Sequence, residues 1–519
     1  MALQWLKKAV FYQIYPQSFY DSNGDGIGDI AGIIAKLDYI QILGVNAIWF
    51  NPWYESPFRD AGYDITDFYK VAKRYGTNKD AQKLFAEAHK RGIKIILDLV
   101  VGHTSIACKW FKESEKLERN AYSDYYVWSP LASYRGNGSD DDYFISGWGP
   151  RGAFLANYYA VQPALNFGYA KVEHAWELRY DDPRCRATKE EIIKIMRFWM
   201  DMGADGFRVD MANSVIKRDA GKRKNIAFWK EIRQIFDRDY PENVLISEWF
   251  NPKESLRAGF HIDFRFNPFW RAGFRPENSK VKWPQMAMAE KDFTDPILSI
   301  KPTFELIQQT RKKGYIGFYS GNHDAARLRY YGSERNTIVK LVMLLTLPGT
   351  PFLYYGDEIG MRYREGLVSK EGGERRTGSR TPMQWDNALP NAGFSKAPKE
   401  QLYLPVDDAP DAPCIADAIK GKNATFNAVT KLIALRRGHI ALDNDADVEL
   451  VYLKHRKMPI AYTRSKGREK LLILLNSCGE DVGVKLPAAK NAQPLLVEGV
   501  RMENGTFSLA GCSYGIYKM

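Results

Sequence analysis

Charged and imidazole side chains stand at or near the ends of four short apolar runs: Asp98 and His103, Arg208 and Asp210, Glu248, and His323 with Asp324. Paired carboxyl groups can act as nucleophile and as general acid and base, and an arginine beside them can stabilise their ionised forms. Imidazoles add hydrogen-bond donors for a ligand. The sequence therefore predicts acid–base chemistry at one site, provided that the fold brings these four ends together.

Simpler roles exist for each residue taken singly. An aspartate at a strand end is commonly a helix cap or an ion-pair partner, and a lone histidine is commonly a buried polar residue. Three carboxylates, two histidines and an arginine at four strand ends are not expected from such roles. The sequence contains no Walker loop, and His103 and His323 lack the spacing of a helical zinc site. The glycines between Gly24 and Gly28 alternate with aspartates that would repel a pyrophosphate.

The elements that must position these residues follow an alternating pattern. We expect eight strands, at residues 10–14, 47–50, 93–101, 206–209, 244–246, 262–266, 316–319 and 352–354. Most are separated by stretches of helical period, namely 30–42, 80–91, 190–202, 227–236, 303–313 and 334–347. This alternation predicts the α/β class and a closed (β/α)8 TIM barrel, in which the loops after the strands form one open face. Arg208 and Asp210 are two residues apart, so they point to the same side of their strand.

Two regions depart from this alternation of strands and helices. Residues 104–170 contain many Tyr, Trp, Gly, Ser and Asp and no long periodic segment, so we expect an inserted lobe after strand three. Beyond a last helix at 426–437, short runs such as 448–453, 470–475 and 482–486 alternate with turn residues. We therefore predict a barrel formed by 1–103 and 171–438, a lobe at 104–170, and an antiparallel β domain at 439–519.

Composition narrows the function classes. Apolar residues make up 45% and charged residues 26%, which is typical of a globular protein and excludes disordered, collagenous and coiled-coil classes. The net charge is +12, yet basic residues are scattered among 62 acidic ones with no nucleic-acid-binding module, so we expect no nucleic-acid partner. Five scattered cysteines, no secretory pattern and no apolar run of bilayer length predict a cytoplasmic protein without a membrane partner.

Ten short motifs, in order along the chain, carry a family resemblance. They are Val10-Phe-Tyr-Gln-Ile-Tyr-Pro-Gln-Ser-Phe, Asp21-Ser-Asn-Gly-Asp-Gly-Ile-Gly-Asp29, Gly62-Tyr-Asp64, Asp98-Leu-Val-Val-Gly-His-Thr104, Gln162-Pro-Ala-Leu-Asn166, Asp205-Gly-Phe-Arg-Val-Asp210, Ser247-Glu248, Asn322-His-Asp324, Gly356-Asp-Glu-Ile-Gly-Met361 and Arg380-Thr-Pro-Met-Gln-Trp-Asp386. Over essentially the whole chain, the sequence resembles the α-amylase superfamily of glycoside hydrolases, in particular its α-glucosidase and oligo-1,6-glucosidase branch.

The resemblance implies roles for individual residues. Asp210 matches the nucleophile, Glu248 the general acid/base, and Asp324 the third carboxylate, which holds sugar hydroxyls. The substrate-binding residues it implies are Tyr63, Asp64, His103, Phe144, Gln162, Arg208, His323 and Arg380. Tyr63 matches a stacking platform under the sugar, and Asp64 with Arg380 matches the pair that grips the non-reducing end. The expected activity is a retaining, exo-acting α-glucosidase on short oligosaccharides or disaccharides, through a β-glucosyl-aspartate, in a monomer or weak homo-oligomer.

The segment from Asp21 to Asp29 is a candidate site for structural Ca²⁺ or Mg²⁺. The oxygen ligands would be the side chains of Asp21, Asn23, Asp25 and Asp29 and the carbonyl of Ile27. Related glucosidases bind a cation in this loop. The alternative is a turn that caps the following helix.

Three departures from the family pattern leave alternatives open. Gly102 replaces the usual Asn, Ala164 replaces an Asp, and Met211 stands where the branch has Val with α-1,6 preference or Thr or Ala with α-1,4 preference. Linkage preference is therefore not predicted. The rivals are a transglycosylase, a trehalose-6-phosphate-type hydrolase that uses the basic cluster 217–224, and a catalytically dead scaffold or carbohydrate-binding homologue. A complete carboxylate triad argues against the scaffold. Aromatic residues of the lobe (Tyr125, Tyr126, Trp128, Tyr143, Phe144, Trp148) are candidates for stacking on sugars.

Overall fold

The computed structural model describes residues 3–138, 141–265, 295–372 and 374–519, so the last residue of the strand expected at 262–266 lies outside the described residues. Eight parallel strands form a closed barrel in the order β1-β13-β12-β11-β10-β9-β5-β2. They are β1 (Phe11–Ile14), β2 (Ala47–Phe50), β5 (Lys94–Val100), β9 (Gly206–Asp210), β10 (Val244–Ser247), β11 (Ile262–Phe264), β12 (Tyr315–Tyr319) and β13 (Thr350–Tyr354). The predicted barrel is confirmed.

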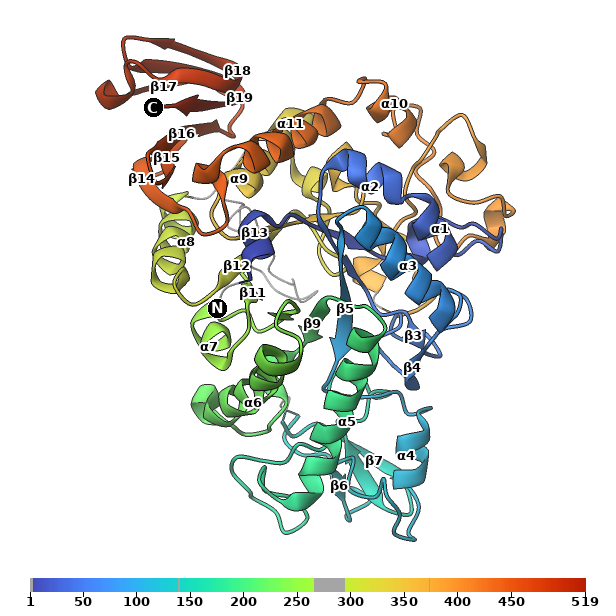
Figure 1. The fold of residues 1–519 in the computed structure, drawn as a ribbon. Coiled ribbons are helices and arrows are strands. Elements are labelled where there is room, and N and C mark those ends of the chain that lie inside the picture. Colours follow the sequence, from blue (N-terminus) through green and yellow to red (C-terminus); the bar gives the residue numbers. More distant parts are fainter. Residues whose placement is uncertain (1–2, 139–140, 266–294, 373) are drawn as a thin grey trace.

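Helices surround the barrel (Figure 1). They are α1 (Ile30–Ala35), α2 (Leu37–Leu43), α3 (Asn78–Lys90), α5 (Pro183–Asp201), α6 (Arg223–Asp239), α7 (Pro252–Ser255), α8 (Ile297–Thr310), α9 (Glu334–Thr346), α10 (Ile415–Ile419) and α11 (Ala424–Gly438). The helix expected at 30–42 is divided at Lys36, whose backbone (φ −109°, ψ 6°) is not helical. Helix α3 begins with a reciprocal capping box between Thr77 and Asp80, which satisfies its first amides.

The chain between β5 and α5 forms the lobe at the lower end of the molecule in Figure 1. It contains α4 (Lys109–Ser114) and a three-stranded antiparallel sheet of β6 (Trp128–Ser129), β8 (Gly152–Leu155) and β7 (Phe144–Gly149). Near the barrel, β3 (Tyr54–Glu55) and β4 (Asp67–Val71) form a small hairpin after β2.

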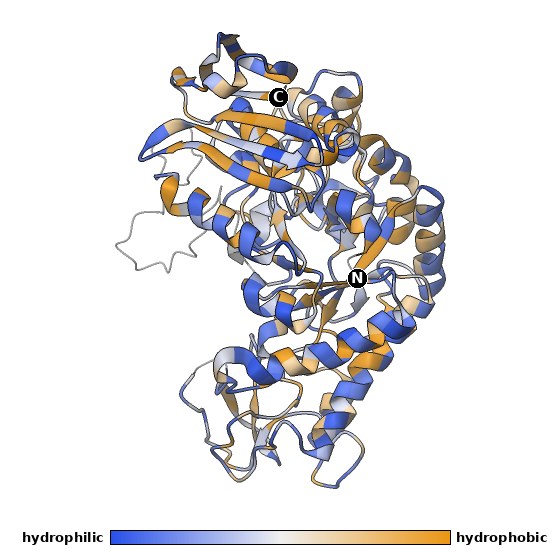
Figure 2. Ribbon diagram, turned by 60° about the vertical axis from the view of Figure 1, so that its left-hand side comes forward, coloured by the Kyte–Doolittle hydropathy of each residue, from blue (hydrophilic) through white to orange (hydrophobic). Residues whose placement is uncertain are grey.

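A second sheet, fully antiparallel, lies at the opposite end from the lobe (Figure 1). Its strands are β14 (Asp447–Lys454), β15 (Lys457–Lys466), β16 (Glu469–Asn476), β17 (Val482–Lys485), β18 (Gln493–Glu503) and β19 (Thr506–Lys518). Strands β16 and β19 pack on α9, which is therefore buried from Asn336 to Thr346 instead of being amphipathic. Hydrophobic residues, orange in Figure 2, and hydrophilic residues, blue, are mixed along the strands of this sheet. The predicted C-terminal antiparallel domain is confirmed.

The described part of the chain contains no helix long and apolar enough to cross a membrane. All five cysteines are buried and free.

Candidate active site

Strand register brings the predicted site residues to one rim of the barrel. Asp98 on β5 is the Cα partner of Arg208 on β9, and Val100 is the partner of Asp210. On the other side of β9, Ser247 pairs with Val209, so Glu248 follows directly at the carboxyl end of β10. Parallel neighbours end at the same edge, and the loops after them carry the site in barrels of this kind.

Arg208 is the centre of the charge arrangement. Its guanidinium Nη1 lies 2.9 Å from Asp98 Oδ1 and 2.9 Å from Asp210 Oδ1, and its Nη2 lies 2.8 Å from Glu248 Oε1. The Arg208 side chain is only 3% exposed. One buried positive charge is therefore shared among three carboxyl groups. Burying such a cluster of charges costs desolvation energy, and clusters of this kind occur preferentially at functional sites.

The two carboxyl groups predicted to act as nucleophile and general acid/base have different pKa values. Burial, together with the neighbouring charges of Asp210 and Asp324, raises the pKa of Glu248 to about 8, although Arg208 opposes the rise. Burial raises the pKa of Asp210 to about 6, and Arg208 opposes the rise. The sequence predicted that Arg208 keeps Asp210 ionised, and at pH 7 this order of pKa values leaves Asp210 ionised and Glu248 protonated.

Contacts between these groups agree with that order. Asp210 and Glu248 share a side-chain hydrogen bond that lowers the pKa of Asp210 and raises that of Glu248, as expected when Glu248 donates. The backbone N–H of Met211 donates to Glu248 Oε2 at 3.2 Å. Met211 reaches this position with a left-handed backbone (φ 44°), an uncommon conformation for a residue other than glycine.

Asp324 differs because cations surround it. Its Oδ1 accepts from Arg376 Nη1 at 2.6 Å and from Arg380 Nη2 at 3.1 Å, and its Oδ2 lies 3.3 Å from His323 Nε2. Burial alone would raise the pKa of Asp324, but the charges of Arg376 and Arg380 hold it well below its usual range. The Asp324 side chain is 31% exposed, the most open of the three carboxylates. It is therefore an ionised acceptor at the mouth of the site.

His323 and Tyr63 belong to one hydrogen-bond chain. Gln13 Nε2 donates to His323 Nδ1 at 3.1 Å, so the proton of the neutral ring is on Nε2, which lies 2.8 Å from Tyr63 Oη. Tyr63 Oη in turn donates to Asp98 Oδ2 at 3.0 Å. The Tyr63 and His323 rings stack with centroids 5.4 Å apart and planes 9° apart. Burial lowers the pKa of His323 to about 3, so this histidine stays neutral.

His103 also lies at the rim, 2% exposed, with Asn157 Nδ2 3.0 Å from its Nδ1. Its Nε2 lies 3.2 Å from the Tyr63 carbonyl oxygen. Both ring nitrogens therefore have protein partners. Burial lowers the pKa of His103 to about 3, so this ring is neutral as well.

The expected pair of Asp64 and Arg380 is not formed among the described residues. Asp64 is fully buried, and its carboxylate accepts hydrogen bonds from Ser56 Oγ and from the backbone N–H groups of Arg59 and Asp60. It is occupied in shaping the loop before Tyr63, because three local donors saturate it. Asp64 was predicted because it lies in the motif Gly62-Tyr-Asp64, which does not include Asp60.

Asp60 and Arg376 have the arrangement expected of that pair. Arg376 Nη2 lies 3.8 Å from Asp60 Oδ1, and its Nη1 lies 2.6 Å from Asp324 Oδ1. Gln162 Nε2 donates to Asp60 Oδ2 at 2.7 Å, so Gln162 orients Asp60. The spacing of Arg376 four residues before Arg380 is the signal that could have identified it.

Phe144 lies in the core of the lobe, away from solvent. It is 3% exposed, pairs with β8 and makes an edge contact with Tyr134. Trp128 and Tyr126 likewise pack on Phe111. Most of the lobe aromatics are therefore its hydrophobic core, since a lobe with so little regular structure needs large side chains to bury enough area.

Tyr158, which the sequence analysis did not select, is an exposed aromatic residue close to the site. It is 50% exposed, its ring contacts Tyr159, and its hydroxyl is close enough to Arg376 and Asp324 for their charges to affect its pKa. Tyr159 Oη accepts from Arg376 Nη2 at 3.0 Å.

The loop from Asp21 to Asp29 uses its oxygens as turn and cap acceptors. Asp21 accepts from the N–H groups of Asn23, Gly24 and Gly26, and Asp29 caps α1 by accepting from Gly32 N. No cluster of three or more carboxylate, histidine or cysteine side chains within the described residues has the arrangement of a metal site. The Ca²⁺ or Mg²⁺ site in this loop stays a prediction.

The basic cluster 217–224 does not face the rim as a group. Lys217 is 2% exposed and donates to Asn157 Oδ1 and Ser214 O. Arg218 forms ion pairs with Glu177, Glu173 and Asp142 of the lobe and its return segment. The charge of Arg218 is therefore paired with carboxylates, and Lys217 is bonded to uncharged oxygens.

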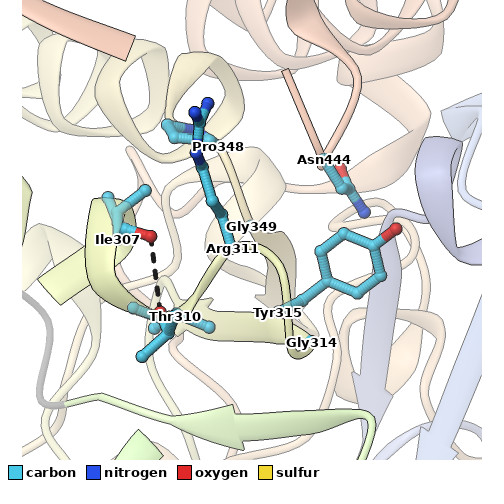
Figure 3. A pocket seen from close by; sticks show the side chains of 9 residues that line it. Ile307, Thr310, Arg311, Gly314, Tyr315, Pro348, Gly349 and Asn444 are labelled. Carbon is cyan, nitrogen blue, oxygen red and sulfur yellow. Dashed lines mark hydrogen bonds between the residues drawn. The ribbon is translucent and has the colours of Figure 1, made fainter. Parts of the chain in front are cut away.

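A small pocket on the other side of the barrel, at the start of β12, is shown in Figure 3. Its lining includes Thr310, Arg311, Tyr315 and Asn444, and its room is about that of one water molecule. It lies at the amino end of the strands and is separate from the rim.

Comparisons with known proteins agree with the geometry of the rim. The alpha amylase catalytic domain profile matches residues 13–445. The chain is 32% identical to the oligo-1,6-glucosidase of Parageobacillus thermoglucosidasius, with 93% of this chain and 92% of that protein covered. It is 35% identical to a trehalose synthase/amylase of Mycolicibacterium smegmatis, covering 77% and 70%. The crystal structure of a Bacillus licheniformis trehalose-6-phosphate hydrolase mutant superimposes with a TM-score of 0.83 at 26% identity, over 99% of both chains. The chain belongs to the alpha-amylase family of glycoside hydrolases.

Proposed function

We propose that this enzyme is a retaining, exo-acting α-glucosidase that releases glucose from the non-reducing end of short oligosaccharides or disaccharides. The observation that carries the proposal is that two buried carboxyl groups have different pKa values, so that one is ionised while the other is protonated. Both contact Arg208, yet the pKa of Asp210 is about 6 and that of Glu248 about 8. A nucleophile must be ionised and a general acid protonated at the same pH, and these values meet both needs near pH 7.

The hydrogen bond between Asp210 and Glu248 supports retention of configuration. Inverting enzymes keep their two carboxyl groups about 6.5–9.5 Å apart to admit water, whereas retaining enzymes hold them at about 5–5.5 Å. Arg208 holds Asp210 Oδ1 at 2.9 Å and Glu248 Oε1 at 2.8 Å, so the two carboxyl groups lie close to each other. They therefore favour the double-displacement route.

In the first step, the Asp210 carboxylate attacks the anomeric carbon while Glu248 gives its proton to the leaving oxygen. The glycosidic C–O bond breaks and a glucosyl ester of Asp210 forms. In the second step, the Glu248 carboxylate takes a proton from water as the water oxygen displaces Asp210. Both carboxyl groups then return to their starting states.

Exo-action is proposed from the groups behind Asp324. Asp60 and Arg376 contact each other, and Arg376 also binds Asp324, so charged groups line one end of the site. A terminal sugar offers more hydroxyls to such groups than an internal residue does. The free, buried cysteines fit a reducing compartment, so we also propose a cytoplasmic location.

Transfer to a sugar acceptor is the second candidate, because a relative at 35% identity is a trehalose synthase/amylase. A phosphorylated disaccharide is favoured less, even though a structural neighbour is a trehalose-6-phosphate hydrolase, because Arg218 and Lys217 of the basic cluster have partners.

A product profile tests the proposal. Purified protein is given maltose, isomaltose, sucrose, trehalose, trehalose 6-phosphate and maltotetraose, and products are identified by chromatography. We expect glucose and the remaining, shorter part of each saccharide as products. Asp210→Asn should show no turnover. New disaccharides without net glucose release would establish transfer instead, and hydrolysis confined to trehalose 6-phosphate would establish the phosphorylated substrate.

A further inference from the structure

Asn157 of the inserted lobe occupies the space beside Gly102. A Cβ atom at Gly102 would lie 2.6 Å from Asn157 Nδ2, and its three nearest atoms all belong to the Asn157 side chain. A contact of this length is not tolerated between real atoms, so any larger residue at position 102 would displace the amide. Glycine at 102 thus makes room for Asn157, which comes from a segment 55 residues further along in numbering (157 − 102).

The orientation of the Asn157 amide is fixed by its neighbours. Lys217 Nζ lies 3.1 Å from Asn157 Oδ1, and an ammonium group can only donate, so the amide oxygen must face Lys217. The NH₂ group then faces His103, with Nδ2 3.0 Å from His103 Nδ1. Asn157 is 6% exposed, so water does not compete strongly for these bonds.

These contacts determine which nitrogen of His103 carries the proton. Because Asn157 Nδ2 donates, His103 Nδ1 must be the bare, accepting nitrogen. His103 Nε2 lies 3.2 Å from the carbonyl oxygen of Tyr63, which can only accept, so Nε2 carries the hydrogen. Both neighbours select the same neutral tautomer, and together they fix the plane of the ring.

The same amide also reaches the nucleophile strand. Asn157 Nδ2 lies 3.6 Å from the sulfur of Met211, the residue that follows Asp210. Met211 N donates to Glu248. Asn157 therefore contacts residues that follow two neighbouring barrel strands, His103 after β5 and Met211 after β9.

We propose that Asn157, oriented by Lys217, is a positioning residue that holds His103 as the neutral tautomer with its hydrogen on Nε2. That hydrogen is donated to the Tyr63 carbonyl oxygen in the free protein and is shared with a sugar hydroxyl when substrate binds. The inference rests on the proposed function in so far as His103 contacts the sugar. The part of the proposal that concerns the tautomer of His103 does not depend on any activity.

The first experiment reads the tautomer directly. Protein labelled with ¹⁵N-histidine is studied by long-range ¹H–¹⁵N correlation NMR without substrate, and His103 is assigned with His103→Gln. We expect a bare Nδ1 and a protonated Nε2 in the wild type. In Asn157→Ala and Lys217→Met, we expect averaging of the two tautomers. Asn120→Ala is the control, since Asn120 donates to Glu113 O inside the lobe.

The second experiment is a double-mutant cycle on kcat/KM. Asn157→Ala should lower kcat/KM by about tenfold or more, because loss of orientation at a sugar-binding group is amplified in the rate. Gly102→Ala should have a similar effect in the wild type, because its methyl group pushes the amide away. In the Asn157→Ala background, Gly102→Ala should change kcat/KM by less than about twofold, since the clash is gone.

Several results would overturn the proposal: a wild-type His103 protonated on Nδ1, an unchanged spectrum in Asn157→Ala, or equal and additive effects of the two substitutions. Melting temperatures of all variants separate positioning from misfolding. If the wild type hydrolyses no glucoside but the spectra behave as expected, the proposed function fails while the positioning of His103 stands.

Discussion

Arg208 Nη1 lies at the same distance, 2.9 Å, from Asp210 as from a second carboxylate, Asp98, so its charge is shared and not devoted to the nucleophile. Sharing explains why burial still raises the pKa of Asp210 to about 6. A guanidinium with several donors in one plane can do this, and a lysine ammonium cannot match its geometry.

Arg208→Ala is accordingly expected to reduce kcat by at least about a hundredfold, because three carboxyl groups lose their shared counter-charge. Arg208→Lys should retain part of the activity. Steady-state kinetics on maltose or isomaltose measure both. Arg218→Lys is the matched control, because Arg218 pairs with Glu177 away from the rim. Activity of Arg208→Ala close to that of Arg218→Lys would contradict the central role of Arg208.

The pH dependence of kcat/KM should be bell-shaped. Asp210 must be ionised, so activity falls as the pH drops through its pKa of about 6. Glu248 must be protonated, so activity falls again as the pH rises through its pKa of about 8. The optimum is therefore expected near pH 7. Glu248→Gln should lose the alkaline limb when an aryl glucoside with a good leaving group is the substrate, and persistence of that limb would reassign the general acid.

Arg376→Ala should raise KM for disaccharides more than tenfold and lower kcat, because Arg376 binds both Asp60 and Asp324. Asp60→Asn should act in the same direction. Arg362→Ala serves as control, since Arg362 pairs with Asp407. A variant at 376 that cleaves internal bonds of maltooligosaccharides faster than the wild type would further support a closed non-reducing end.

Phe144 and Tyr158 should respond to truncation in opposite ways. Phe144→Ala is expected to destabilise the protein by about 3 kcal/mol with little change in KM, because it empties a buried site in the lobe. Tyr158→Ala, at an exposed position, should leave the melting temperature nearly unchanged and raise KM. Thermal melts and kinetics on the same preparations decide. A large KM effect of Phe144→Ala at unchanged stability would restore its predicted role in substrate binding.

Removal of metal distinguishes the two interpretations of the loop from Asp21 to Asp29. The contacts of Asp21 and Asp29 with backbone N–H groups favour a capped turn. We therefore expect the melting temperature to change little with EDTA, and Asp29→Ala to cost about 1 kcal/mol as the loss of a helix cap. Stoichiometric Ca²⁺ or Mg²⁺ retained after exhaustive dialysis, found by elemental analysis, would instead establish the ion site.

The amino-acid sequence determined the barrel. Its eight strands were predictable because each is a short apolar run whose period and length are local properties, and the alternation with helices allows few topologies. The same local logic placed Asp210, Glu248 and Asp324 at strand ends. Their meeting at one rim follows from parallel pairing, as the register of Asp98 with Arg208 shows.

The tertiary structure decided what side chains from distant segments do to one another. Asp60, and not Asp64, contacts Gln162 and Arg376, and Phe144 is buried against Tyr134. Likewise, the sequence shows only that Gly102 lacks a side chain, and the fold shows that Asn157 occupies the space beside it. Distances between residues far apart in the chain set burial, charge and hydrogen bonding, and no local pattern encodes those distances.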